Sequence, residues 1–143
     1  MEHSPQVGIV MGSASDWPIM EHAARTLRDF GIPWQAEVAS AHRSLDKLQA
    51  FVGPARQNGL KAIIAGAGAA AHLAGVTAAI TDIPVLAVPI DSTSLKGLDA
   101  LLAMVQMPGG VHGTGLADGE GGHRDAAGHL DHGEQRIEAF QGG

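Results

Sequence analysis

Residues 7–18 read Val-Gly-Ile-Val-Met-Gly-Ser-Ala-Ser-Asp-Trp-Pro, and this stretch decides the fold class. Its first five residues are a short, almost entirely apolar run that stops at Gly12, which predicts a buried β-strand. Residues 18–30 then predict an amphipathic helix whose apolar face holds Met20, Ala23, Leu27 and Phe30. A buried strand, a small polar loop and an amphipathic helix in succession indicate the start of an α/β domain.

The same alternation continues to about residue 110. We expect further strands over residues 34–39, 62–65 and 84–89, and further helices over residues 44–58, 69–81 and 95–106. The second helix would turn inward Leu45, Leu48, Val52 and Ala55, and the last would turn inward Leu98, Leu101, Leu102 and Val105. Strands alternating with helices predict right-handed crossovers and a parallel sheet covered on both faces.

The overall composition narrows the classes of function. The chain has 143 residues with 45% hydrophobic side chains, a formal net charge of −6 and no cysteine. An acidic domain is not expected to bind nucleic acid or an anionic membrane, and the lack of cysteine excludes disulfides and thiol chemistry. No apolar run approaches the length of a membrane span, and the polar first residues are not typical of a signal peptide. We therefore expect a cytoplasmic protein.

The last 33 residues differ from the rest, so we divide the chain into an α/β domain over residues 1–110 and a tail over residues 111–143. The tail holds nine glycines, four histidines and six acidic residues, with neither strand nor helix periodicity. Such a segment buries little apolar surface, and we expect it to be mostly disordered. Its histidines have irregular spacing, which does not predict a metal site.

Small and polar residues gather where the predicted strands end. The four strand ends run into residues 12–18, 40–44, 66–68 and 89–92. Because ligands of open parallel α/β sheets bind at the carboxyl ends of the strands, this edge is the candidate site.

The first strand end has two interpretations. Gly12, Ser13 and Ser15 offer hydroxyls and backbone N–H groups at a helix start, which suits a phosphate, and the Asp16 carboxylate could accept bonds from ribose hydroxyls. The alternative is simple capping by Ser15 or Asp16, with Pro18 in the first turn.

The second strand end carries His42 beside Arg43. Arginine suits a bidentate grip on phosphate or carboxylate, and histidine is the natural general acid/base near neutral pH. The alternative is a solvated surface pair.

The third strand end also leaves alternatives open. Residues 66–71 match the dinucleotide fingerprint G-x-G-x-x-A, although after the third strand instead of the first. Alternatively, these small residues let a flat reactant approach the backbone closely. His72 would either face that pocket or pack locally.

Several motifs in order give the chain a family resemblance. Residues 7–18, Ser40-Ala41-His42-Arg43, residues 63–68 with 70–73, Pro84-Val85-Leu86 and residues 105–110 closely resemble the N5-carboxyaminoimidazole ribonucleotide mutase family of purine biosynthesis. This resemblance implies a flavodoxin-like three-layer α/β/α sandwich, a homo-octamer, and an isomerase that moves a carboxyl group from the exocyclic nitrogen to carbon 4 of an aminoimidazole ribonucleotide. It implies no metal and no organic cofactor.

The resemblance also implies roles for particular residues. Ser13 and Asp16 would bind phosphate and ribose, Arg43 would bind phosphate, and His42 would be the general acid/base. Gly66, Ala67, Gly68 and His72 would line a carboxylate pocket that Met107 helps to close. The implied substrate-binding set comprises Gly12, Ser13, Ser15, Asp16, Ser40, Ala41, Arg43, Gly66, Ala67, Gly68, His72 and Met107.

The chain departs from the family pattern in two places. Residues 69–75 read Ala-Ala-Ala-His-Leu-Ala-Gly where the family reads Gly-Gly-Ala-Ala-His-Leu-Pro-Gly, which adds a methyl group and removes a proline. After Gly110 neither the family's fifth strand nor its C-terminal helix is visible, and the tail composition is what GC-rich codons yield out of register. We hypothesise a frameshift near Val111, against a genuine divergent tail. The alternatives to an active mutase are a ribonucleotide-binding chain with little or no activity and a dinucleotide-binding module.

Overall fold

A four-stranded parallel sheet forms the centre of the computed structural model, which describes residues 4–91 and 93–107. The strands are β1 (Val7–Met11), β2 (Trp34–Val38), β3 (Ala62–Gly68) and β4 (Val85–Ile90), in the order β2-β1-β3-β4. This is the flavodoxin-like order, as the resemblance implies. The expectations of a disordered tail, a missing fifth strand and a frameshift concern residues outside those described.

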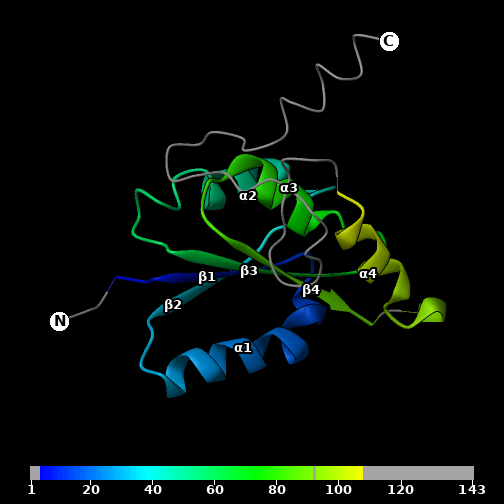
Figure 1. Cartoon of the computed structure of the whole chain (residues 1–143), viewed down its shortest axis with the longest axis horizontal. Helices are drawn as coiled ribbons and strands as arrows, with labels where there is room; N and C mark the ends of the chain where they lie inside the picture. The colour runs from blue at the N-terminus through cyan, green and yellow to red at the C-terminus, as the bar shows by residue number, and fades with distance from the viewer. Residues whose placement is uncertain (1–3, 92, 108–143) are drawn as a thin grey trace, which may run out of the picture.

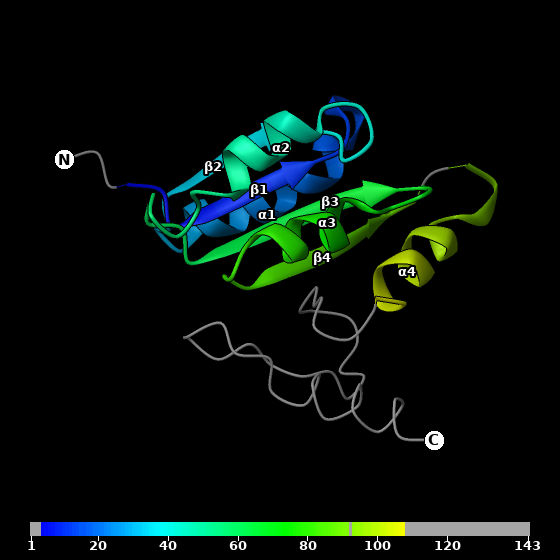
Figure 2. The same cartoon turned by 90° about the horizontal axis from the view of Figure 1, so that it is seen from above.

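Helices cover both faces of the sheet. The chain forms α1 (Trp17–Asp29), α2 (Leu45–Val52), α3 (Leu73–Ile80) and α4 (Leu98–Val105), with single 3₁₀ turns at Ala14–Asp16 and Thr93–Leu95. Figure 1 shows α1 below the sheet and α2 and α3 above it, and Figure 2 shows α4 beside β4. The predicted three-layer α/β/α sandwich is confirmed, because every crossover carries its helix onto one of the two faces.

The sheet separates two cores. The larger core, between the sheet and α2, α3 and α4, contains Val10, Leu48, Val52, Ile63 and Val85. The smaller core, between the sheet and α1, contains Ile9, Met11, Met20, Ala24 and Ile90. Alternate residues of β1 enter opposite cores, which is the period-two pattern of a strand buried on both faces.

Several predicted elements have different bounds in the structure. The helices predicted over residues 69–81 and 95–106 are shorter, at Leu73–Ile80 and Leu98–Val105. The helix predicted over residues 44–58 ends at Val52, because Gly53 and Pro54 follow and residues 53–59 form turns. The strand predicted over residues 62–65 continues to Gly68, so the small residues 66–68 are paired with β4 and do not form a loop.

The predicted inner faces of three helices are partly wrong. The side chains of Leu98 and Leu102 are 53% and 44% exposed, and α4 instead buries Ala100 and Met104. In α1, Met20 and Ala24 are buried, whereas Phe30 lies past the end of the helix and is 76% exposed. Leu45, at the start of α2, is also exposed. In α1 and α4, alanine and methionine are the buried side chains, which lets each helix lie close to the sheet.

The amino ends of the strands form a different surface. There a cleft lies between the end of α2 and the end of α3, and Arg56 Nε forms an ion pair with Asp82 Oδ2 at 2.7 Å. Within residues 4–91 and 93–107, no helix is long and apolar enough to cross a membrane.

Candidate active site

The first loop after β1 is held by a capping box. The Ser13 N–H donates to Asp16 Oδ2 at 3.0 Å, and Ser13 Oγ accepts from the Ser15 N–H at 3.2 Å. The predicted capping role therefore falls to Ser13, because Asp16, directly before α1, caps no N–H of that helix. The arrangement holds the Asp16 carboxylate at the start of the helix.

The surroundings of Asp16 change the pKa of its carboxyl. Burial raises the pKa of its carboxyl above the ordinary value of 3.8, and the hydrogen bond from the Ser13 backbone lowers that pKa by less. Burial penalises the charged form because the carboxylate loses water. A desolvated carboxylate with one oxygen uncommitted is suited to accept hydroxyl groups of a ligand.

The second loop is fixed by two serines. Ser40 Oγ accepts from the backbone N–H groups of His42 at 3.3 Å and Arg43 at 3.2 Å, while Ser44 Oγ accepts from the Ser40 N–H at 2.8 Å. Lys47 of α2 also donates to the Val38 carbonyl at the end of β2. Short serine side chains that bond nearby backbone are typical of such turns. The loop therefore presents His42 and Arg43 on a defined backbone.

The third loop connects β3 to α3 and contains a backbone conformation rare for its residue type. Ala69 has φ = +53°, the left-handed region that favours glycine. The His72 N–H donates to the Ala70 carbonyl at 2.9 Å, and the His72 carbonyl accepts from the Val76 N–H at 3.0 Å. His72 is therefore anchored on both sides at the start of α3.

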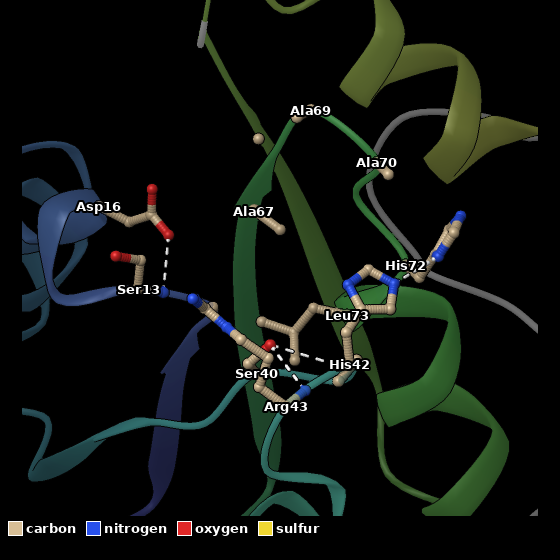
Figure 3. Close-up of a pocket in the computed structure, with 13 residues that line it drawn as sticks. Ser13, Asp16, Ser40, His42, Arg43, Ala67, Ala69, Ala70, His72 and Leu73 are labelled. Carbon is tan, nitrogen blue, oxygen red and sulfur yellow. Dashed lines mark hydrogen bonds between the residues drawn. The ribbon is translucent and has the colours of Figure 1, made fainter.

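These three loops enclose one pocket of about 220 Å³ at the carboxyl edge of the sheet (Figure 3). Its lining comprises Gly12, Ser13, Asp16, Ser40, Ala41, His42, Arg43, Ala67, Gly68, Ala69, Ala70, His72 and Leu73. Figure 3 shows the Arg43 side chain extended toward the Ser13 loop. Within the described part of the chain Arg43 makes no ion pair, so its guanidinium is available to an anion.

The two histidines of the pocket contact each other. His42 Nε2 and His72 Nδ1 lie 2.7 Å apart, with the rings 4.9 Å apart and nearly perpendicular. Sequence reasoning brought both rings to this edge but missed their contact, because 30 residues separate them and no motif states the direction of a side chain. It also missed Ser44, although a serine four residues after Ser40 in a turn was a usable signal.

Three predicted site residues lie outside the pocket lining. Ser15 Oγ bonds Ser13 Oγ at 2.8 Å on the exposed side of its turn. Gly66 faces the smaller core, where a Cβ atom would come 2.2 Å from Met20 Sδ. Met107 packs on α3, where a Cβ atom on Gly75 would come 2.5 Å from Met107 Sδ. A substrate would contact these three residues only if it extended beyond the pocket or if the chain moved.

Metal ions and dinucleotides each require a particular arrangement of residues. Among residues 4–91 and 93–107, no group of three or more His, Cys, Asp or Glu side chains is placed to hold a metal ion. The first three residues of the fingerprint at residues 66–71 lie within β3, and α3 begins only at Leu73. A dinucleotide needs such glycines in a tight turn that leads directly into the helix.

Comparison with known proteins agrees with this geometry. The family model for AIR carboxylase matches residues 6–130. The chain belongs to the AIR carboxylase family. The match includes all three loops of the pocket and extends past Gly110 into the tail.

Curated members of the AIR carboxylase family are similar over most of the chain. The N5-carboxyaminoimidazole ribonucleotide mutase of Vibrio cholerae is 52% identical over 120 residues, which cover 84% of this chain and 74% of that protein. The mutase of Bacillus subtilis is 53% identical over 107 residues, covering 75% and 66%. The crystal structure of Treponema denticola PurE has a TM-score of 0.69 at 29% identity, covering 76% of this chain and 68% of that one.

Proposed function

We propose that this chain is an isomerase of purine biosynthesis that converts N5-carboxyaminoimidazole ribonucleotide to 4-carboxy-5-aminoimidazole ribonucleotide. The observation that carries this proposal is the single pocket in which His42 and Arg43 of one loop meet Asp16 of another. The curated relatives named as this mutase support the same activity.

The charges and small residues of the pocket suit each part of this substrate. Arg43 would bind the phosphate together with the Ser13 loop, and the Asp16 carboxylate would accept the ribose hydroxyls. Ala67, buried, and Gly68 leave room for a flat ring and a carboxyl group close to the backbone. A pocket this small would keep carbon dioxide beside the ring between the two half-reactions.

His42 would serve first as an acid and then as a base. It gives a proton to the carbamate nitrogen, the nitrogen–carbon bond breaks, and carbon dioxide departs. The electron-rich ring carbon then attacks carbon dioxide, and His42 accepts the proton that this carbon loses. We further propose that the reaction takes place in the cytoplasm and that several copies assemble, as an octamer in the family resemblance.

The test is turnover of the carbamate substrate by the purified chain and by His42→Asn. We expect the variant to fold and to bind the ribonucleotide, while kcat falls by about 10²–10⁴-fold, the usual contribution of a general acid/base. His22→Asn is the matched control, because His22 is exposed on α1 outside the pocket. Full activity of His42→Asn would remove His42 from the mechanism.

Two further results would change the proposed function itself. Binding of the ribonucleotide without turnover by the unaltered chain would identify a binding protein of the same family. Preferential binding of NAD in a parallel titration would favour the dinucleotide interpretation of residues 66–71.

A further inference from the structure

The contact between His42 and His72 leaves room for one hydrogen atom. At 2.7 Å, His42 Nε2 and His72 Nδ1 are within hydrogen-bond distance, so one nitrogen donates and the other accepts. Figure 3 shows the second nitrogen of the His42 ring, Nδ1, facing away from His72 toward the open pocket. The direction of the shared bond therefore decides whether the pocket meets a lone pair or an N–H group.

The position of His72 favours its role as acceptor. Its backbone lies at the N-terminus of α3, whose eight residues are Leu73–Ile80, and its side chain caps no N–H of that helix. A helix N-terminus carries partial positive charge and disfavours a second positive charge on the ring beside it. We therefore take His72 Nδ1 as the acceptor of the hydrogen bond and His42 Nε2 as its donor, which leaves His42 Nδ1 facing the pocket.

We propose that His72 is a positioning residue that fixes the hydrogen of the His42 ring on Nε2 and directs Nδ1 at the substrate. This inference rests on the function proposed above and goes beyond it, because it assigns His72 to His42 instead of to the substrate carboxylate. His72 thus acts through another residue and touches no reacting atom.

The proton balance of the reaction is consistent with this role. In the acid state His42 carries hydrogen on both nitrogens, and its Nδ1 gives a proton to the carbamate nitrogen as the nitrogen–carbon bond breaks with its electron pair on nitrogen. His42 is then neutral, keeps hydrogen on Nε2, and has a lone pair on Nδ1. After the carbon–carbon bond forms, that lone pair takes the proton from the ring carbon. His72 neither gains nor loses a proton.

The first test is NMR of the ligand-free chain with ¹⁵N-labelled histidine. The chain has eight histidines, and the signals lost in His42→Asn assign the ring of interest. We expect hydrogen on Nε2 of His42, hydrogen on Nε2 of His72, and a scalar coupling across the bond between His42 Nε2 and His72 Nδ1. Hydrogen on His72 Nδ1, pointing the other way, would overturn the proposal. This measurement requires no turnover, so it is independent of the proposed function.

The second test is kinetic. In His72→Leu the acceptor is lost, and we expect kcat to fall by about 10–100-fold with little change in KM. A fall of this size corresponds to the loss of one charge-assisted hydrogen bond. His72→Asn places an amide oxygen near the position of Nδ1, and we expect it to restore most of kcat. A wild-type kcat in His72→Leu, or equal losses in both variants, would refute a positioning role.

Discussion

At the scale of single residues, the site is built from side chains whose conformations are set by local hydrogen bonds. Ser13 and Asp16 hold one another, and Ser40 holds the backbone of His42 and Arg43. The chemistry-bearing groups are therefore fixed before a ligand arrives, which lowers the entropy lost on binding. Two residues of the site are held in unfavourable states: the Asp16 carboxyl is desolvated, and Ala69 has a left-handed backbone. Each can be tested individually.

Asp16→Asn tests the cost of the buried carboxyl. Because the pKa of Asp16 is raised in the folded chain, the folded state holds its proton to higher pH than the unfolded state does. The contribution of this group to the free energy of unfolding is therefore largest below pH 3.8 and is lost as the pH rises through the raised pKa. Asparagine keeps an oxygen for the Ser13 N–H but does not ionise.

Urea unfolding between pH 3.5 and pH 7 measures this difference. We expect the stability of Asp16→Asn relative to the unaltered chain to increase as the pH rises above 3.8, while ribonucleotide binding weakens. A difference that stays constant with pH would contradict the raised pKa.

Ala69→Gly tests the left-handed backbone of the third loop. An L-residue in this region is strained, so glycine at φ = +53° should raise the free energy of unfolding by about 0.5–1 kcal/mol. Ala70→Gly is the matched control, since Ala70 is also exposed in this loop but is not among the residues with positive φ. We expect the control to be destabilised by a similar amount in thermal or urea unfolding, and stabilisation of both variants would exclude the strain.

At the scale of elements, α1 and β3 meet at one position where nothing larger than glycine fits. Gly66 in β3 lies directly under the Met20 side chain of α1, and Met20 is itself only 1% exposed. Because Gly66 neighbours the pocket residue Ala67, and α1 begins directly after Asp16, this contact links two walls of the site.

Gly66→Ala should therefore destabilise the chain. The added Cβ atom would come 2.2 Å from Met20 Sδ, and we expect a loss of about 1–3 kcal/mol, the usual range for overpacking. The measurement is urea unfolding of Gly66→Ala, Met20→Ala and the double variant. In the double variant the loss should be smaller than the sum of the two single losses, because the clash is absent. If the losses in free energy of unfolding were additive, the two side chains would not be in steric conflict.

The sequence predicted the strands well, but it predicted side-chain directions poorly. All four strands and the parallel sheet followed from apolar runs such as residues 7–11, and the pocket loops followed from the rule that ligands bind at the carboxyl ends of strands. The inner face of α4 was not predicted correctly. Leu98 and Leu102 are more apolar than Ala100 and Met104, but the space against β4 favours small or flexible side chains. The His42–His72 bond was not predicted either, because it depends on side-chain directions across the fold.

At the scale of the whole molecule, several large apolar side chains remain exposed on the edge strand β4 and on the segment that follows it. Leu86 of β4, Leu95 before α4, and Leu98 and Leu102 of α4 are each more than two-fifths exposed. Large apolar side chains that remain exposed are a common feature of surfaces that contact another chain. The proposed assembly of several copies would give these residues a partner.

Sizing of the purified chain tests that assembly. We expect a mass well above the 14.6 kDa of one chain, and we expect Leu98→Glu combined with Leu102→Glu to lower it without loss of helical circular dichroism. Phe30→Glu, at an exposed residue just past the end of α1, is the control and should leave the mass unchanged. A chain of 14.6 kDa at every concentration, fully active, would contradict the proposed assembly.

The ion-paired cleft at the amino ends of the strands offers a site for a fluorescent label away from the pocket. Gln57 is exposed there, on the edge opposite the pocket, and the chain contains no cysteine. Gln57→Cys would carry the chain's only thiol, so a maleimide dye would attach at one defined point. Its fluorescence anisotropy would then follow tumbling, and hence the association of subunits, in the same cuvette in which catalysis is recorded.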